Sequence, residues 1–238
     1  MVNIFLCGHD GAMGGVVLGC AATQKDLNVS PFTKGQGSAC CDVLLDFSHP
    51  DMLASILTFT KKCKAPLVIA TTGFSKEQEA QIIAASKDIP ILRSANFSLA
   101  VYKFVKAVAD FARNWNGDIE IVETHHNQKK DAPSGTALVL ANAILQARGG
   151  KGKIILGRTP QSGKRVPGDI GVTAVRGGTV AGLHEVRFYD EAAEVVMYER
   201  EYGKQSFALG ALEACRFMAK VTKPGIYNMD DLTKKQEK

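Results

Sequence analysis

A glycine-rich turn directly after the first apolar run most restricts how this chain can fold. Val2–Cys7 is an apolar run typical of a buried strand, and the turn that follows it begins at Gly8. From Ala12 to Ala22 the pattern is that of a helix. A strand, a glycine turn and a helix form the first half of a βαβ unit, so the chain is predicted to begin with a parallel sheet.

Apolar runs and helical patterns continue to alternate after this first unit. Cys41–Phe47 and Pro66–Ala70 are short runs typical of strands, and the apolar residues of Met52–Cys63 fall on one helical face between them. Ser75 starts a Ser-x-x-Gln capping box, which predicts a further helix, and Ile89–Leu92 is another strand. This alternation predicts a mostly parallel sheet covered by helices on both faces.

The pattern changes after Asn96, where a second domain is predicted. A long helix is expected from about Ser98 to Trp115, Asp118–Glu123 alternates like a strand with one exposed face, and another helix follows Ser134. Three strands without intervening helices are predicted at Gly171–Arg176, Leu183–Tyr189 and Glu194–Glu201. This order predicts an α+β domain with an open mixed sheet.

The expected fold class is α/β, with an N-terminal Rossmann-type dinucleotide-binding domain and a central α+β domain for substrate binding and oligomerisation. A last helix at Gln205–Lys220 is expected to return to the first domain, which then spans residues 1–97 and 204–238. Residues 98–203 form the central domain. The exposed face of the strands between Gly171 and Glu201 is expected to be an oligomer interface, because such a sheet leaves apolar surface uncovered.

Composition argues against several classes of partner. The formal net charge of +5 is too small to indicate nucleic-acid binding, and no aromatic-rich basic stripe accompanies it. No apolar run approaches the roughly 18 residues of a membrane helix, and the first residues lack the basic front of a signal peptide. We therefore expect a cytoplasmic protein that binds neither nucleic acid nor membrane, with a surplus of positive charge that suits small anionic ligands.

The cysteines show no metal-binding or disulfide pattern. None of the six forms a Cys-x-x-Cys pair, and they are scattered over predicted strands and helices. They are therefore interpreted as small buried apolar residues rather than a disulfide framework or a zinc site. The six are Cys7, Cys20, Cys40, Cys41, Cys63 and Cys215.

The glycine turn lies where a Rossmann domain binds a pyrophosphate. Glycine lets phosphates approach the backbone, and the N–H groups and dipole of the following helix attract them. The alternative is that these glycines only permit close packing of strand and helix; the position after the first strand favours a dinucleotide. His9 and Asp10 are interpreted as turn residues of this site rather than catalysts.

The second strand predicts which dinucleotide is bound. An Asp or Glu about 20 residues after the glycines usually binds the ribose hydroxyls of NAD, but Leu27–Lys34 contains no acid. The hydroxyl of Thr33 and the charge of Lys34 suit a 2′-phosphate. This favours NADPH, with NADH as the alternative.

The stretch Glu120–Ala137 carries the most chemical information. Its Ser134-Gly135-Thr136 begins a helix whose free N–H groups and hydroxyls can bind a carboxylate. Lys129 and His126 can supply positive charge and further donors. His125, with a pKa near neutrality, can exchange protons with a reacting nitrogen or carbon.

Each of these residues also has a purely structural interpretation. A single histidine is more often structural, Ser134 can be only a helix cap, and Lys129 with Lys130 can be a solvated pair. Their combination favours a site. His125 and His126 are adjacent on a strand, so their rings are expected to point to opposite faces and to have different roles. Two histidines without a third ligand at suitable spacing make a zinc site improbable, so no metal is predicted.

The stretch Glu120–Ala137 resembles the signature of the 4-hydroxy-tetrahydrodipicolinate (dihydrodipicolinate) reductases. It matches Glu-Ile-x-Glu-x-His-x-x-x-Lys-x-Asp-x-Pro-Ser-Gly-Thr-Ala without a mismatch. The resemblance extends over nearly the whole chain, through segments that begin at Gly8, Asp46, Ala70, Ser94, Arg176 and Lys223.

What this resemblance implies is a reductase of a small cyclic dicarboxylate that uses NADPH or NADH and forms a homotetramer, with a nucleotide domain closing onto the central domain. His125 and Lys129 would have the acid–base roles. The substrate's carboxylates would be bound by His126, Lys129, Ser134, Gly135 and Thr136. Cofactor contacts would come from Gly8, His9, Asp10, Gly11, Ala12, Met13, Phe47, Ser48, Ala70, Thr71, Thr72, Ser94, Ala95, Asn96, Phe97 and Lys204.

The chain departs from the family pattern at three places. Ala12 stands where an arginine or lysine is common, which weakens the case for strict NADPH use and leaves dual specificity open. Ala70 replaces a common glycine, and the stretch between the first helix and Cys41 is shorter than in many relatives.

Two other functions have the same architecture. An oxidoreductase acting on an aspartate-derived aldehyde would need a nucleophilic cysteine near the nicotinamide, and the first half of the central domain contains none. A non-catalytic NAD sensor would have no reason to combine His125, Lys129 and the Ser134–Thr136 helix start. The sequence therefore favours the reductase.

Overall fold

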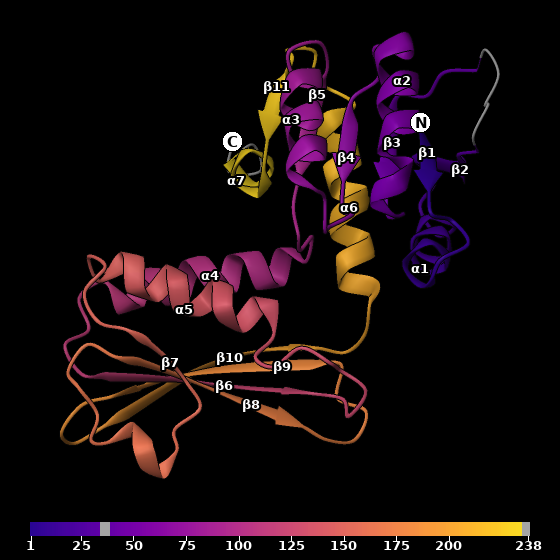
Figure 1. Cartoon of the computed structure of the whole chain (residues 1–238). Coiled ribbons are helices and arrows are strands. Elements are labelled where there is room, and N and C mark those ends of the chain that lie inside the picture. Colours follow the sequence, from indigo (N-terminus) through magenta and orange to yellow (C-terminus); the bar gives the residue numbers. More distant parts are fainter. Residues whose placement is uncertain (34–38, 235–238) are drawn as a thin grey trace. The chain divides into compact units, whose positions relative to one another are not determined.

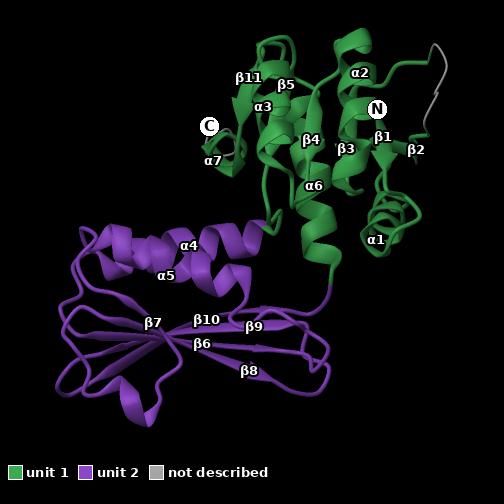
Figure 2. Cartoon of the chain, viewed as in Figure 1, with its two compact units in different colours: residues 1–98, 204–238 green, residues 99–203 purple. Residues whose placement is uncertain are grey.

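The chain divides into two structural units, and a computed structural model describes residues 1–33 and 39–234 of it. Unit 1 is built from both ends of the chain, Met1–Ser98 and Lys204–Lys238, and unit 2 comprises Leu99–Gly203 (Figure 2). Each unit has its own sheet and its own core. That unit 1 binds a dinucleotide and unit 2 a substrate stays a prediction.

Unit 1 contains a parallel sheet, as predicted. Among the described residues it has six strands in the order β11-β5-β4-β3-β1-β2, and every neighbouring pair is parallel. The order reverses between β1 and β3, which is where doubly wound folds bind their ligands. The strands are β1 (Val2–Cys7), β2 (Leu27–Pro31), β3 (Val43–Asp46), β4 (Leu67–Ile69), β5 (Pro90–Arg93) and β11 (Gly225–Tyr227).

Helices cover both faces of this sheet, which is why β3 and β4 are continuously apolar and buried (Figure 1). One face packs against α2 and α3, and the other against α6, which in turn packs on α1. The Ser75 capping box at the start of α3 is confirmed. The helices are α1 (Ala12–Ala21), α2 (Leu53–Cys63), α3 (Lys76–Ala85), α6 (Gln205–Met218) and α7 (Met229–Lys234), with a 3-10 turn η1 at Pro50–Met52.

The predicted return of the last long helix to the first domain is confirmed. Helix α6 buries a small-residue face that includes Ala208 and Ala211 against β3, β4 and β5. Its Arg216 forms an ion pair with Asp26 just before β2, with Nε 2.7 Å from Oδ2. The hydrogen bond from Arg216 lowers the pKa of Asp26 to about 2. The C-terminal segment is thereby joined to the N-terminal one.

Unit 2 has the mixed sheet that was predicted. Its order among the described residues is β10-β9-β6-β8-β7; β10, β9 and β6 pair antiparallel, and β6, β8 and β7 pair parallel. Helices α4 and α5 cover one face (Figure 1). The elements are α4 (Leu99–Ala112), β6 (Asp118–His125), α5 (Gly135–Ala147), β7 (Ile154–Leu156), η2 (Pro160–Ser162), β8 (Ile170–Arg176), β9 (Gly182–Tyr189) and β10 (Glu194–Glu201).

The covered face of this sheet changes from apolar to polar along β6. Ile119 and Ile121 are buried opposite Phe188 and Val186 of β9 and form the core under α4 and α5. Two residues further along the same face, Glu123 is also buried although it is charged. Side chains two residues apart on a strand share a face, so the polar residues occupy one end of the core face. None of the helices among the described residues has the length and apolarity needed to cross a bilayer.

One interpretation of the cysteines was wrong. Cys40 and Cys63 form a disulfide, with their Cα atoms 5.6 Å apart. The pairing is not visible in the sequence because the end of α2 brings Cys63 beside the chain that enters β3, 23 residues away. Cys7 and Cys215 are buried, as expected of small apolar residues.

We expect the glycine turn to tolerate alanine at Gly15 but not at Gly14. A Cβ atom at Gly14 would lie 2.1 Å from the backbone oxygen of Gly8, whereas one at Gly15 would meet nothing within 4 Å. Gly14→Ala should therefore lower the free energy of unfolding by about 1–3 kcal/mol through overpacking. Gly15→Ala should raise it by about 0.5–1 kcal/mol, as is usual inside a helix. Urea unfolding of both variants tests this, and equal stabilities would contradict the packing described here.

Candidate active site

The residues predicted to bind a cofactor lie together at one edge of the unit 1 sheet. Because its strands are parallel, the segments that follow their carboxyl ends meet at this edge. Gly8 has a φ of +81°, and a Cβ there would lie 2.3 Å from the backbone oxygen of Phe47. The turn after β1 and the loop after β3 are therefore in close contact. The predicted residues follow β1 (Gly8, His9, Asp10, Gly11, Ala12, Met13), β3 (Phe47, Ser48), β4 (Ala70, Thr71, Thr72) and β5 (Ser94, Ala95, Asn96, Phe97).

The start of α1 fits the pyrophosphate of a dinucleotide. Gly11 is the N-cap residue, no side chain caps the helix, and its first turn contains no acid. The first N–H groups of a helix have no partner within the helix, so those of Ala12 and Met13 are suited to bind phosphate oxygens. Glycine at position 11 keeps the approach to them open.

A buried carboxyl group that sequence reasoning missed organises this edge. Asp46, at the end of β3, is 1% exposed and accepts hydrogen bonds from the backbone N and the Oγ of Ser48, at 3.0 and 2.5 Å. The same Ser48 N–H also donates to Thr71 Oγ1 at 3.0 Å. Burial raises the pKa of Asp46, although the hydrogen bonds from Ser48 and Thr71 oppose this. Asp46 thus fixes the loops after β3 and β4 relative to each other.

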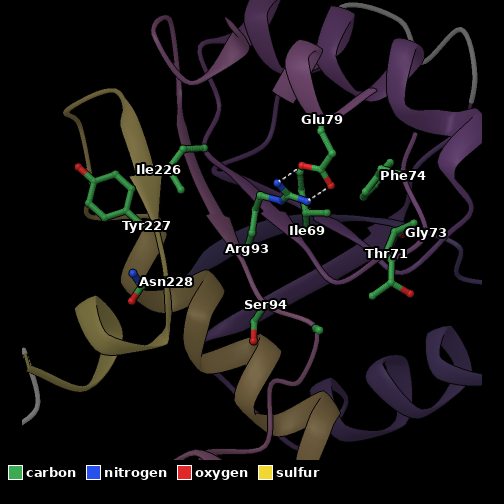
Figure 3. Close-up of a pocket in the computed structure, with 12 residues that line it drawn as sticks. Ile69, Thr71, Gly73, Phe74, Glu79, Arg93, Ser94, Ile226, Tyr227 and Asn228 are labelled. Atoms are coloured by element: carbon green, nitrogen blue, oxygen red, sulfur yellow. Dashed lines mark hydrogen bonds and ion pairs between the residues drawn. The ribbon is translucent and has the colours of Figure 1, made fainter. Parts of the chain in front are cut away.

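A cavity of about 420 Å³ opens beside these loops (Figure 3). The predicted residues Thr71, Thr72, Ser94 and Ala95 line one part of it. The other part was not predicted to be functional and is lined by Ile69, Gly73, Phe74, Glu79, Arg93, Ile226, Tyr227 and Asn228.

The charges in this cavity are paired with each other. Arg93 Nη1 and Nη2 lie 2.6 and 2.7 Å from the two carboxylate oxygens of Glu79, and the guanidinium lies over the ring of Phe74 (Figure 3). Arg93 lowers the pKa of Glu79. Tyr227 comes from the short strand β11, which the sequence pattern did not predict. Its three residues are too few to show a strand period.

The remaining predicted cofactor residues lie elsewhere. Thr33 is exposed and follows β2, next to β1 in the sheet. Lys34 lies outside the described residues. Lys204 is exposed and precedes α6. The structure does not bring Thr33 or Lys204 into the lining of the cavity.

In unit 2, the end of β6 holds the predicted proton-transfer residue against a buried carboxylate. His125 is 8% exposed, and its Nδ1 lies 2.5 Å from Oε2 of Glu123, which is completely buried. A carboxylate only accepts hydrogen bonds, so Nδ1 carries the proton and the Nε2 lone pair remains for chemistry. Gly182 lies beside Nε2; a Cβ at this position would be 3.2 Å from that atom.

Glu123 is held ionised by three donors. Arg176 binds it in a bidentate pair, with N–O distances of 3.0 and 2.8 Å, and the N–H of Ser134 donates to Oε1 at 3.0 Å. Burial alone would raise the pKa of Glu123, but the hydrogen bonds from Arg176, His125 and Ser134 outweigh it and lower the pKa. A charged carboxylate therefore lies behind His125.

The surroundings of His125 favour its neutral form. Burial lowers the pKa of its imidazole, and the positive charge of Lys129 acts in the same direction. The hydrogen bond to Glu123 opposes this but does not cancel it. The ring of His184 lies edge-on to that of His125, with centroids 5.2 Å apart.

The start of α5, next to this pair, has features that suit anion binding. Ser134 is the N-cap residue, and its Oγ accepts a hydrogen bond from Ala137 N at 3.2 Å. The first turn contains no acid, and a Cβ added at Gly135 would meet nothing within 4 Å, so the space before the helix is open. Gly135 and Thr136 carry the first N–H groups of the helix, which suit a carboxylate.

Lys129 and His126 lie in the loop between β6 and α5. The Nζ of Lys129 is 2.8 Å from Oδ1 of the exposed Asp131, whose pKa it lowers. His126 lies beyond the last residue of β6, so the strand alternation used to predict its orientation does not apply to it. It is partly exposed, whereas His125 is buried.

Three charged or polar partners in unit 2 had no predicted role: Glu123, Arg176 and His184. The sequence contained a signal for the first, because Glu123 and His125 are two residues apart on a predicted strand and must share a face. The other two are brought in by pairing, since Arg176 of β8 is opposite His125 and His184 of β9 is opposite Glu123. Such register cannot be obtained from local pattern alone.

Comparison with protein families matches both parts of the chain. The family model described as "Dihydrodipicolinate reductase, C-terminus" matches residues 99–233, and "Dihydrodipicolinate reductase, N-terminus" matches residues 33–97. The first of these matches includes all of the β6–α5 region.

Individual proteins show the same likeness. A 4-hydroxy-tetrahydrodipicolinate reductase of Clostridium botulinum is 39% identical over 249 residues, covering 98% of each chain. One of Caldanaerobacter subterraneus is 38% identical and covers 99% of each. The solved structure of a dipicolinate-bound dihydrodipicolinate reductase from Paenisporosarcina has a TM-score of 0.75 at 20% identity, covering 95% of this chain and 98% of that one, so it has the same fold.

We expect the pKa of His125 to fall further in a Glu123→Gln variant. The amide keeps an acceptor for Nδ1 but removes the charge that favours the imidazolium, and it leaves Arg176 without its counter-ion. NMR titration of the imidazole resonances measures this, with Asp51→Asn, beside the exposed His49, as a control that should leave His125 unchanged. An unchanged or raised His125 pKa in Glu123→Gln would contradict the assignment.

The same depressed pKa has a consequence for stability. The folded state binds the His125 proton less readily than the unfolded chain does, whose histidine has a pKa of about 6.5. The contribution of His125 to the free energy of unfolding therefore falls as the pH drops below about 6.5. In His125→Gln this part of the pH dependence should be absent from urea unfolding curves.

Proposed function

Because the chain belongs to the dihydrodipicolinate reductase family, we propose that it reduces 4-hydroxy-tetrahydrodipicolinate to tetrahydrodipicolinate with NADPH or NADH, in lysine and diaminopimelate biosynthesis. The relatives from Clostridium botulinum and Caldanaerobacter subterraneus carry that activity in their names and align over at least 98% of this chain. The observation that supports the proposal most is the Glu123–His125 pair beside the open helix start at Gly135. A proton-transfer group and an anion site lie next to each other there.

The loop from His126 to Thr136 is proposed to bind the two carboxylates of the substrate. The helix start at Ser134, Gly135 and Thr136 offers N–H groups and the positive end of the α5 dipole. Lys129 and His126 add further hydrogen-bond donors from the preceding loop. Asp131 holds the Lys129 ammonium in the free protein, and a substrate carboxylate is proposed to replace it as partner.

His125 and Lys129 are proposed to handle the proton. The Nδ1–H of His125 is fixed by Glu123, so proton exchange takes place at Nε2, which Gly182 leaves accessible. A depressed pKa makes the His125 imidazolium a stronger acid than an ordinary one, so it gives up its proton readily. Lys129 stabilises negative charge that develops on the ring as it is reduced.

Unit 1 is proposed to hold the cofactor, which when bound supplies the hydride. The first turn of α1 would bind the pyrophosphate, and the loops after β3, β4 and β5 would bind the rest. Asp46 would keep Ser48 and Thr71 in place without contacting the cofactor itself. The absence of an acid after β2, together with Thr33 and Lys34, favours NADPH.

The outer face of the unit 2 sheet is proposed to join subunits into a homotetramer. Val175, Val196 and Tyr198 point away from α4 and α5 and are 42%, 39% and 68% exposed. Val175 is on β8, whereas Val196 and Tyr198 are on β10, which β6 and β9 separate from β8 in the sheet. A partner subunit would cover these exposed apolar side chains. A monomer in sedimentation at micromolar concentration would count against this assembly. A cytoplasmic location remains a prediction from the sequence.

The catalytic assignment predicts different effects for two substitutions. His125→Gln should lower kcat by about 10²–10⁴-fold if proton transfer limits the rate, with little change in substrate KM. Lys129→Ala should lower kcat and raise KM, because it removes both a charge and an anion contact. Neither should change NADPH affinity, since both residues belong to unit 2.

Steady-state kinetics with enzymatically generated substrate measure these effects, and circular dichroism confirms folding. Lys130→Ala and His49→Gln, which change exposed residues of the same types, are matched controls and should behave as the parent. If His125→Gln and Lys129→Ala fold and reduce substrate within a few-fold of the parent, the site assignment is wrong. If both lose NADPH instead, these residues belong to a nucleotide pocket.

We predict that NADPH binds at least as well as NADH. The sequence from residue 32 to 38, after β2, contains no carboxylate that could repel a 2′-phosphate. Titration of each nucleotide, followed by quenching of protein fluorescence, gives the two affinities. NADH favoured by more than about tenfold, ~1.4 kcal/mol, would overturn the prediction.

A further inference from the structure

A second buried carboxylate–imidazole pair lies beside the first one in unit 2. His184 of β9 and Glu199 of β10 are 2% and 8% exposed, and His184 Nδ1 lies 3.3 Å from Glu199 Oε2. The register places Glu123, His184 and Glu199 opposite one another on three adjacent strands, β6, β9 and β10. The proton-transfer roles proposed above use Glu123 and His125 but leave His184 and Glu199 without a role.

This second pair contacts the helix start that is proposed to bind the substrate. His184 Nε2 is 3.3 Å from the Oγ of Ser134. The backbone N–H of the same serine donates to Glu123. Ser134 is therefore held from two sides, by the first pair through its N–H and by the second through its hydroxyl.

The positions of the protons in this series of hydrogen bonds follow from which atoms accept. With the Glu199 carboxylate as acceptor, His184 Nδ1 carries the proton and Nε2 is an acceptor. Ser134 Oγ already accepts a hydrogen bond from Ala137 N, so its own proton is available to donate to His184 Nε2. Each of the three contacts that link Glu199, His184, Ser134 and Ala137 then has one donor and one acceptor.

We propose that His184, oriented by Glu199, is a positioning residue for substrate binding. It accepts a hydrogen bond from the hydroxyl of Ser134 and so fixes the start of α5, whose N–H groups bind a substrate carboxylate. This rests on the proposed function for its ligand. In a buried polar network, a hydroxyl that loses its acceptor destabilises the folded state and can rotate to another orientation. With Ser134 unanchored on one side, the N–H groups of Gly135 and Thr136 are less well directed at an anion.

Two substitutions of His184 separate the contacts of its two nitrogen atoms. A glutamine places its amide near the position of Nε2 and can still accept a hydrogen bond from the Ser134 hydroxyl. An asparagine reaches only the position of Nδ1, so it can keep the contact with Glu199 but loses the one with Ser134. The probe is dipicolinate, the dicarboxylate present in the Paenisporosarcina structure. Its affinity reports substrate-site binding without catalysis.

Calorimetric titration of dipicolinate into the NADPH-loaded protein is expected to give an about tenfold or larger rise in Kd for His184→Asn and a change within about threefold for His184→Gln. Substrate KM should follow the same order, with kcat less affected. NADPH affinity should stay constant. Glu191→Gln, an exposed acid in the turn between β9 and β10, is the control and should match the parent.

Two outcomes would overturn the proposal. If both His184 variants bind dipicolinate like the parent, His184 does not position the site. If both are folded and equally weakened, His184 acts through something other than the hydroxyl of Ser134. Failure of the proposed function has a different signature, namely that the parent does not bind dipicolinate or that Lys129→Ala binds it equally well.

An NMR measurement without ligand tests the geometry in that case, and also if His184→Asn fails to fold. Long-range ¹H–¹⁵N spectra should show the His184 ring proton on Nδ1, and the Nε2 resonance should shift in Ser134→Ala. A proton on Nε2, or an Nε2 resonance that ignores Ser134→Ala, would contradict the proposal. A His125 spectrum unaffected by Ser134→Ala would show that the change is local.

Discussion

The carboxylate of Glu123 is the interaction on which the proposed site depends. It is completely buried at the point where the core face of the unit 2 sheet turns from apolar to polar, and a buried charge is tolerated only when it is paired and hydrogen-bonded. Arg176, His125 and Ser134 supply those partners. Since these come from β8, β6 and the start of α5, satisfying one charge fixes the relative positions of the proposed proton-transfer group and the proposed anion site.

In unit 1 the proposed cofactor site is organised mainly by close backbone contacts rather than by buried charge. Its parallel strands end at one edge, and the close approach of Gly8 to Phe47 and of Gly14 to Gly8 leaves no room for a side chain at either glycine. The N–H groups at the start of α1 can then face a ligand directly. Asp46 and Thr71 both accept hydrogen bonds from Ser48 and so hold the loops after β3 and β4 together. Rigid loops around an open helix start are what binding a long, flexible dinucleotide requires.

Local pattern was sufficient for most elements and for the motif, but not for pairing. The alternation of strands and helices, the Ser75 capping box and the presence of helix α6 follow from periodicity and capping, which are properties of short segments. Strands β7 and β11 were missed because three residues show no period. The Cys40–Cys63 disulfide and the contacts of Arg176 and His184 depend on segments far apart in sequence meeting in space, which no local signal specifies.

The central claim is that Glu123 acts through His125. A double-mutant cycle on kcat with Glu123→Gln, His125→Gln and the double variant tests this most directly. If Glu123 serves to orient and charge-balance His125, the double variant should be no more than a few-fold slower than His125→Gln alone. If the rate loss of the double variant equals the product of the two single losses, Glu123 and His125 contribute independently, which would contradict this account.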